Sequence, residues 1–226
     1  MRILIVSDIH GASKATALIA GQLSEIDLIL IAGDITDFGG ERAGREVLDP
    51  LTRAGIPIAA VSGNCDRDGV RIFLSKAGYS VEGRSRTLCG LRLAGAGGGL
   101  FRQGLTPFEA TEDELEDSIR AALSYDEASA APLVVLTHTP PAGTKLDRRR
   151  STHVGSQALG SILAERSPIL WISGHIHESR SVSTKGGATL INPGPLHDGF
   201  YATATVLDKD GVVSIEAELR DLQRTR

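Results

Sequence analysis

The chain has 226 residues, of which 41% are hydrophobic and 23% are charged, and its 24 basic and 28 acidic side chains give a formal charge of −4. This composition is typical of a soluble globular protein and excludes a disordered, collagen-like or coiled-coil chain. The acidic balance also disfavours a protein whose whole surface binds a nucleic acid polymer or anionic lipid.

Short apolar runs alternate with amphipathic helical segments in the first half of the chain. This alternation is typical of α/β folds with mostly parallel strands joined by crossover helices. We expect strands over 3–6, 28–32 and 58–61, and helices over 15–23, 41–53 and 70–77. A strand is expected over 87–94, and the glycine-rich stretch 95–104 predicts a mobile loop because glycine weakens regular structure.

The helix with the clearest signals begins after Thr111. Thr111 and Glu114 have the spacing of a capping box, and the apolar residues Leu115, Ile119 and Leu123 share one face. We expect this helix to be followed by a strand at 133–137, a long irregular segment at 138–155, a helix at 156–166 and a strand at 169–173.

The irregular segment 138–155 is longer than most connections, and long loops in compact domains are often functional. From residue 181 onward, short apolar runs separated by turn residues predict antiparallel sheet. No repeat or linker divides the chain, so we expect one domain over 1–226.

Polar side chains follow five of the predicted strands, at the edge where open α/β sheets bind ligands. In chain order they are Asp8 and His10, Gly33 and Asp34, Gly63, Asn64 and Asp66, His138, and Gly174, His175 and His177. Each group alone is an ordinary turn signal, since Asp and Gly favour turns. Five groups at one sheet edge instead indicate a ligand site.

The donors in this set are carboxylates, an amide oxygen and imidazoles. Such donors can hold two divalent ions about 3.5–4 Å apart when one carboxylate bridges them, the arrangement used in phosphoester hydrolysis. Imidazole and carboxylate together suit transition metals and allow Mn, Fe, Zn or Ni without selecting one.

These motifs, in this order, resemble those of the calcineurin-like metallophosphoesterase family, from residue 8 to about residue 177. The resemblance implies a four-layer αββα sandwich of two mixed sheets flanked by helices, and a dinuclear metal-dependent hydrolase for which manganese is one of the expected metals. It assigns Asp8, His10 and His177 to a first metal, Asp34 to a bridge, and Asn64, His138 and His175 to a second metal. It also implies in-line attack on phosphorus by a metal-bridging hydroxide.

One position departs from the commonest family pattern, in which a histidine follows the asparagine of the third motif and the next aspartate orients it. This chain has Cys65 there, between Asn64 and Asp66, and is similar in this to small prokaryotic family members with Asn-Cys-Asp. A thiol is a weak proton donor at neutral pH. We therefore count Asn64, Asp34, Cys65 and Asp66 as candidate catalytic residues and expect a phosphodiesterase; the alternative is that Cys65 only packs.

Residues outside these motifs carry weaker signals. His153, near a predicted helix start, is a candidate substrate contact or a capping residue. The arginines at 148–150 either clamp phosphate or form a solvated loop. His197 has no partner that the sequence identifies. Loops 95–108 and 138–155 would supply the contacts to the alcohol part of the substrate.

Two other functions remain to be weighed against a phosphoesterase acting on a small phosphate ester. A protein-interaction module could keep the fold and lose the reaction, but all seven ligand positions here hold competent residues. A recombination-type nuclease needs a basic groove, which this acidic chain lacks. A homodimer is our expectation for the assembly.

The compartment is inferred from cysteine content and hydropathy. Cys65 and Cys89 are too few for a disulfide framework, which indicates a reducing, cytoplasmic location. The apolar start 1–6 is too short for a signal peptide. No apolar run approaches the roughly 18 residues that cross a bilayer, so we expect no membrane partner.

Overall fold

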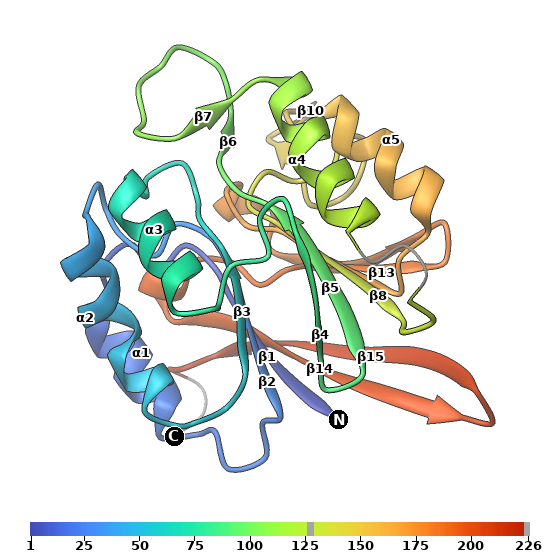
Figure 1. Ribbon diagram of the computed structural model, residues 1–226, viewed down its shortest axis with the longest axis horizontal. Coiled ribbons are helices and arrows are strands. Elements are labelled where there is room, and N and C mark those ends of the chain that lie inside the picture. The colour runs from blue at the N-terminus through green and yellow to red at the C-terminus, as the bar shows by residue number, and fades with distance from the viewer. Residues whose placement is uncertain (126–128, 224–226) are drawn as a thin grey trace.

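Two β-sheets pack face to face, and helices cover the outer face of each sheet (Figure 1). The computed structural model describes residues 1–125 and 129–223. Its layers run helix, sheet, sheet, helix, which confirms the four-layer αββα sandwich that the motif resemblance implies.

The first sheet has five strands in the order β15-β14-β1-β2-β3. Their bounds are β1 Arg2–Val6, β2 Leu28–Ala32, β3 Ile58–Val61, β14 Phe200–Lys209 and β15 Val212–Asp221. β1, β2 and β3 are parallel, while β14 runs antiparallel to β1 and to β15. The helices on its outer face are α1 Ser13–Ala20, α2 Glu41–Thr52 and α3 Asp68–Lys76.

The second sheet has six strands in the order β12-β13-β11-β8-β5-β4. Their bounds are β4 Ser85–Leu88, β5 Leu91–Ala96, β8 Leu133–Thr137, β11 Leu170–Ile172, β12 Ser181–Lys185 and β13 Ala188–Asn192. The helices α4 Glu112–Ser124 and α5 Gln157–Arg166 cover its outer face. Short elements complete the fold: β6 Gly99–Leu100, β7 Glu109–Ala110, β9 Arg148–Arg149, β10 Thr152–His153, and the 3-10 helices η1 His177–Ser179 and η2 Leu196–Asp198.

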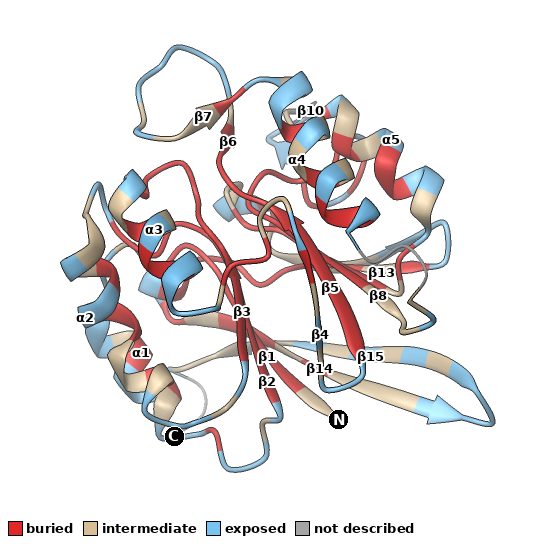
Figure 2. Cartoon of the chain, viewed as in Figure 1, coloured by how far each residue is buried: buried red, intermediate tan, exposed pale blue. Residues whose placement is uncertain are grey.

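Strand alternation divides the core into three parts. In β1, Ile3 and Ile5 face the second sheet, while Leu4 and Val6 face α1 and α2, and all four are buried. Trp171 of β11 is fully buried against α4 and α5. The buried residues therefore form continuous bands along both sheets (Figure 2).

Local sequence signals account for many element boundaries. Thr111 caps α4 in a capping box with Glu114, as predicted, and Ser156 caps α5 through the amide of Leu159.

The strand predicted over 87–94 is instead a hairpin of β4 and β5. Its turn, Cys89–Gly90, has a φ of 50° at the cysteine and 78° at the glycine, and cysteine is not a usual residue for that conformation.

Two further expectations are corrected by the sheet topology. The strands after residue 181 do not form one antiparallel sheet, because β13 lies parallel to β11 in the second sheet while β14 and β15 join the first. The stretch 95–104 is not simply an irregular loop, because its first residues complete β5 and Gly99–Leu100 pairs with β7 as β6.

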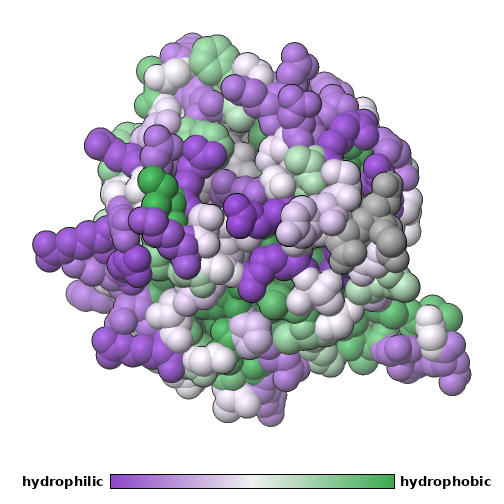
Figure 3. Space-filling view, viewed as in Figure 1, coloured by the Kyte–Doolittle hydropathy of each residue, from purple (hydrophilic) through white to green (hydrophobic). Residues whose placement is uncertain are grey.

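The hairpin of β14 and β15 projects beyond the rest of the first sheet (Figure 1). Hydrophobic surface extends along this hairpin toward a hydrophilic tip (Figure 3). In the described part of the chain, no helix is both long enough and apolar enough to span a membrane.

Candidate metal centre

The predicted ligand positions converge at the carboxyl ends of the parallel strands of both sheets. Asp8 and His10 follow β1, Asp34 follows β2 and Asn64 follows β3, whereas His138 follows β8 and His175 and His177 follow β11. The sandwich brings these two sets together because the sheets face each other, so the structure places all seven side chains at one site.

Asp8, His10 and His177 form one group of donors, whose ligand atoms all lie within 4.8 Å of one another. The Nε2 atom of His177 lies 3.2 Å from Oδ1 of Asp8, and the His10 and His177 rings are 5.5 Å apart between centroids. Asp8 is fully buried. This is the group to which the resemblance assigned the first metal.

Asp34 lies between this group and His138, which follows β8 of the second sheet. Its Oδ2 atom is 3.6 Å from Nε2 of His10 and 3.3 Å from Nε2 of His138. Its Oδ1 atom accepts a hydrogen bond of 2.7 Å from the backbone amide of Cys65. Asp8, Asp34 and His138 form a further group of donors within 4.8 Å of one another. Asp34 therefore has the position of a shared carboxylate.

His138, Asn64 and His175 lie on the other side of Asp34. The Nε2 atom of His138 lies 3.0 Å from Oδ1 of Asn64, and its Nδ1 atom lies 2.8 Å from the carbonyl oxygen of Ala32. The His138 and His175 rings are 5.0 Å apart between centroids. The backbone amide of His175 lies 3.2 Å from each carboxylate oxygen of Asp8, which links the two halves of the site.

Four of the seven residues have left-handed backbone conformations. The φ angles are 52° at Asp8, 46° at His10, 49° at Asp34 and 67° at His175. Such angles cost a non-glycine residue free energy, on the order of 1–3 kcal/mol each, and occur where the surroundings enforce them. The strands end abruptly here, and the left-handed residues turn the side chains toward a common centre.

Glycines next to the ligands allow the loops to approach closely. A Cβ atom at Gly63 would lie 2.6 Å from Cγ of Asp34 and closer still to its Oδ1 and backbone nitrogen. A Cβ at Gly174 would overlap Ser7 and the Asp8 carboxylate. The glycines of the Gly-Asn and Gly-His motifs are therefore required by contact distance.

The site contains buried side chains of opposite charge, and these charges shift one another's pKa values. Burial raises the pKa of Asp34, but the charge and hydrogen bond of His138 outweigh it and hold the pKa below its usual range. Burial likewise raises the pKa of Asp8, and the hydrogen bond with His177 and the charge of His138 reverse the shift. Burial and the positive charge of His138 lower the pKa of His175 to about 4.

The donors fit divalent metal ions. The buried Nε2 atom of His10 has no hydrogen-bond partner among the described residues, which is costly for a buried nitrogen unless another group binds it. The two carboxylates are ionised, and His175 is neutral at physiological pH. Imidazole nitrogens and carboxylate oxygens at these separations are suitable ligands for transition metals.

We expect metal binding to release protons, because His138 is doubly protonated in the metal-free protein. Both ring nitrogens face oxygen acceptors, and although burial lowers the pKa of His138, the charge of Asp34 outweighs it and raises the pKa to about 9. A ligating imidazole must give up one proton. Titration calorimetry with Mn²⁺ at pH 7.5, in buffers of different ionisation enthalpy, measures the release.

The raised pKa of His138 also determines in which direction the stability of the metal-free protein changes with pH. A raised histidine pKa stabilises the metal-free fold fully below the ordinary value of 6.5, and this contribution is lost as the pH rises through about 9. Proton release on metal binding should decline over the same upper interval. Metal binding with no proton uptake or release at pH 7.5 would contradict this protonation state.

Asp66 and Cys65, which follow Asn64, have different surroundings. The buried Asp66 carboxylate accepts hydrogen bonds from the amides of Ile35, Thr36 and Gly63 and from the Thr36 hydroxyl. Burial and the charge of Asp34 nevertheless raise its pKa to about 6. Asp66 thus ties the Asp34 loop to the Asn64 loop.

Cys65 lies at the edge of the candidate centre. The residue is buried, and its sulfur accepts a hydrogen bond of 3.4 Å from Nδ2 of Asn64 and belongs to a group of donors with His10 and Asp34 within 4.8 Å. Burial, followed by the charge of Asp34, raises the pKa of the thiol far above its ordinary value. Cys65 is therefore neutral at physiological pH.

His153 does not cap α5, because Ser156 fills that position. The Nδ1 atom of His153 lies 2.6 Å from Oδ1 of the buried Asp147, and its side chain is 45% exposed. Its place as a substrate contact stays a prediction. Of the three neighbouring arginines, Arg149 borders the site, beside His175.

His197 is a site residue for which the sequence offered no partner. Its ring lies 5.1 Å from that of His10 and 5.4 Å from that of His177 between centroids, and its Nδ1–H donates to the Asp8 carbonyl oxygen at 3.1 Å. β13 is parallel to β11, so the segment after β13 also reaches this edge. The antiparallel sheet predicted after residue 181 gave no reason to expect His197 at this edge.

Two adjoining cavities open beside the candidate centre. One, of about 440 Å³, is lined by Asn64 and His175, and the other, of about 340 Å³, by His175 and His177. Arg149 lines both. As expected, the walls of the larger one come from the segments after β5 and after β8.

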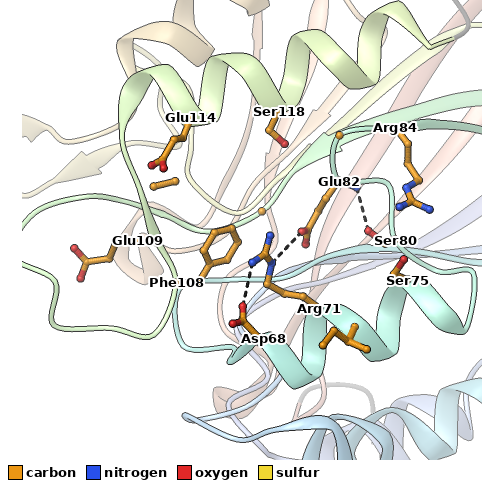
Figure 4. Close-up of a pocket in the computed structure, with 14 residues that line it drawn as sticks. Asp68, Arg71, Ser75, Ser80, Glu82, Arg84, Phe108, Glu109, Glu114 and Ser118 are labelled. Carbon is orange, nitrogen blue, oxygen red and sulfur yellow. Dashed lines mark hydrogen bonds and ion pairs between the residues drawn. The ribbon is translucent and has the colours of Figure 1, made fainter.

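A larger cavity, of about 770 Å³, lies between α3 and α4 and includes none of the candidate ligands (Figure 4). Its central Arg71 lies over the Phe108 ring at 4.0 Å from the centroid and pairs with Asp68 at 3.1 Å and Glu82 at 3.6 Å. Glu82 in turn accepts from the amide and hydroxyl of Ser62. Because Arg71 and Glu82 are paired with each other, we interpret them as a structural network that holds Ser62 and the adjoining Gly63 loop, and not as a ligand site.

Comparison with known proteins decides the family. The family profile described as calcineurin-like phosphoesterase matches residues 1–179. The chain belongs to the calcineurin-like phosphoesterase family. Membership supports a metal-dependent phosphoester hydrolase. Over 210 residues, this calcineurin-like phosphoesterase is 27% identical to the uncharacterized protein MJ1162 of Methanocaldococcus jannaschii, covering 90% of this chain and 92% of that protein.

Solved structures share the fold of this calcineurin-like phosphoesterase. The protein TT1561 of Thermus thermophilus is 17% identical, covers 98% of both chains and has a TM-score of 0.74. A dimetal phosphatase from Danio rerio is 14% identical, with 96% of this chain and 98% of that chain covered and a TM-score of 0.65. At these identities the likeness concerns the fold alone.

Proposed function

We propose that the protein is a dinuclear metal-dependent phosphoesterase that acts on small phosphodiesters. The observation that carries this proposal is the position of Asp34, whose carboxylate lies within 3.6 Å of His10 on one side and within 3.3 Å of His138 on the other. A shared carboxylate between two sets of donors is the arrangement that two adjacent ions require.

The proposed ligands follow the two sets of donors. Asp8, His10 and His177 would hold one ion, and Asn64, His138 and His175 the other, with Asp34 shared. When bound, Mn, Fe, Zn or Ni would activate a water molecule and neutralise phosphoryl oxygens. Asp66 would act as a positioning residue, since its hydrogen bonds hold the Asp34 and Asn64 loops in register. Both sheets supply ligands, so the activity needs the sandwich as one unit over 1–226.

The preference for diesters rests on Cys65. A neutral, buried thiol supplies no imidazolium to a departing alkoxide, so esters with acidic leaving groups should react best. A protein described as a novel archaeal phosphodiesterase has the same fold, at 14% identity and a TM-score of 0.52 over 97% of this chain and 100% of that chain.

The cytoplasmic location and the homodimer stay predictions. The projecting β14–β15 hairpin is the surface where we would look for a dimer contact.

Metal analysis of the purified protein, followed by a substrate screen, tests the proposed function. The panel contains phosphomonoesters and phosphodiesters, each assayed with Mn, Fe, Zn and Ni. We expect about two ions per chain and turnover of bis(p-nitrophenyl) phosphate. Failure to bind metal, or no turnover over the whole panel, would instead favour a protein-interaction module.

Replacing Cys65 by alanine is expected to leave the rate of hydrolysis of bis(p-nitrophenyl) phosphate within about threefold of wild type, because a thiol with a raised pKa is a poor general acid. Cys65→His, which introduces the commoner family residue, should raise the relative rate on alkyl leaving groups. The measurement is kcat/KM across esters of graded leaving-group pKa. An alanine variant that loses aryl diesterase activity with normal metal content would show that the thiol does more than we propose.

A further inference from the structure

Of the two cavities beside the candidate centre, the one lined by Asn64 has walls from the segment after β5 and from the segment after β8. Leu100, Leu105 and Ile176 contribute apolar surface, and Arg102 and Arg149 contribute positive charge. At about 440 Å³ the cavity has the size of a small-molecule site. Because it begins at Asn64 and His175, a substrate held at the metal centre would extend its leaving portion into this space.

Two cations, Arg102 and Arg149, line this cavity, and they differ in how the protein holds them. The Arg149 guanidinium has no hydrogen bond or ion pair with any residue in the ranges 1–125 and 129–223. Arg102, by contrast, donates to the Val154 carbonyl oxygen at 3.1 Å and ties the two loops together. Glu178 also borders the smaller cavity that Arg149 lines, without forming an ion pair with it.

The backbone that carries Arg149 is anchored. The Ser179 hydroxyl, in the 3-10 helix that begins at His177, donates to the Arg148 carbonyl oxygen. At the base of the β9–β10 hairpin, the buried Asp147 accepts from the amides of Gly143 and Thr144 at 3.1 and 3.2 Å. The hairpin is therefore fixed to the segment that supplies a proposed metal ligand.

Glu109, the carboxylate that lines the same cavity, forms no ion pair with Arg149 in the described part of the chain. Both oxygens of Glu109 are occupied by backbone amides of residues 102–106. The proposed metal ions would balance the charge of the scissile phosphate, whereas Arg149 lies outside the set of ligands. A second anionic group on the substrate would find its partner there.

We propose that this cavity is a subsite for substrates in which a second phosphoryl group and an apolar or aromatic body lie next to the scissile phosphate, with Arg149 as the cation that binds the second phosphoryl group. Nucleotide-type phosphoanhydrides and diesters belong to this class. The inference rests on the proposed function for its catalytic part and on the cavity alone for its binding part.

The chain provides matched controls, because Arg148 and Arg150 adjoin Arg149 but line neither cavity. The variants Arg149→Gln, Arg148→Gln and Arg150→Gln change the net charge equally. We expect Arg149→Gln to lower kcat/KM for ADP-ribose, which has two phosphoryl groups, by on the order of tenfold to a hundredfold. Its kcat/KM for bis(p-nitrophenyl) phosphate should change less than about threefold, and the two controls should resemble wild type on both substrates.

A binding measurement separates this subsite from the proposed activity. Calorimetric titration of the metal-free protein with ADP should show binding that Arg149→Gln weakens about tenfold or more and that the control variants retain. If no ester is hydrolysed but ADP binding still depends on Arg149, the proposed function fails and the subsite stands. Equal behaviour of the three glutamine variants, equal loss on both substrates, or no ADP binding by wild type would overturn the subsite.

Discussion

Asp34→Asn is expected to abolish metal-dependent hydrolysis of an aryl phosphodiester, with kcat/KM falling by about 10³-fold or more. Asp34 is the carboxylate between the two sets of donors, and the charge and hydrogen bond of His138 outweigh the effect of burial and keep it ionised. Asparagine retains the shape and one oxygen, but it loses the charge and the capacity to bridge. The measurement combines steady-state kinetics with Mn²⁺ and metal stoichiometry of the purified variant.

The matched control is Asp37→Asn, which removes the same charge from an exposed position in the same loop. It should retain wild-type kinetics. Thermal unfolding of both metal-free variants establishes that each is folded. An unchanged rate in Asp34→Asn, with its metal content verified, would refute the bridging assignment.

Gly63→Ala is the second substitution with a large expected effect. Its Cβ would overlap the Asp34 backbone and carboxylate, so one loop must move. Overpacking of a buried site costs about 1–3 kcal/mol of stability, and a displacement of Asp34 should remove most metal binding and activity. Denaturant unfolding of the metal-free protein and calorimetric titration with Mn²⁺ measure the two effects separately.

Gly40→Ala provides the comparison for this glycine. Gly40 precedes α2, has a φ of −102°, and would place its Cβ more than 4 Å from the atoms around it. Only a small loss of helix capping is expected, below about 1 kcal/mol, with metal affinity unchanged. If Gly63→Ala bound Mn²⁺ as tightly as Gly40→Ala, the close approach of the two loops would not matter for the site.

The strands and the convergence of the seven polar side chains at one sheet edge were predictable, because both depend on local patterns. The runs 28–32, 58–61 and 133–137 are strands with the predicted bounds, since continuous apolar runs of this length are typical of strands buried on both faces. Asp8 and Asp34 were expected to lie close together because parallel strands end at one edge, and their carboxylates do.

Features that depend on tertiary contacts escaped prediction. His197 reaches the site only because β13 is parallel to β11, which no local pattern specifies. Among the arginines at 148–150, composition cannot distinguish the one that faces the cavity. The left-handed angles at Asp8 and Asp34 arise from loop packing, since neither residue type by itself requires them.

The Glu109 carboxylate has a consequence for how substrate preference can change. Its hydrogen bonds to the amides of 102–106, led by that of Arg102, lower its pKa to about 2, so the loop keeps its shape throughout the physiological range. Five of these bonds come from backbone amides, and the side chains of Gln103 and Leu105 take no part in holding Glu109, so these two can vary without altering the path of the chain. Evolution, or an engineer, can therefore replace Leu105 or Gln103 to accept a different leaving group while the wall of the cavity stays preorganised.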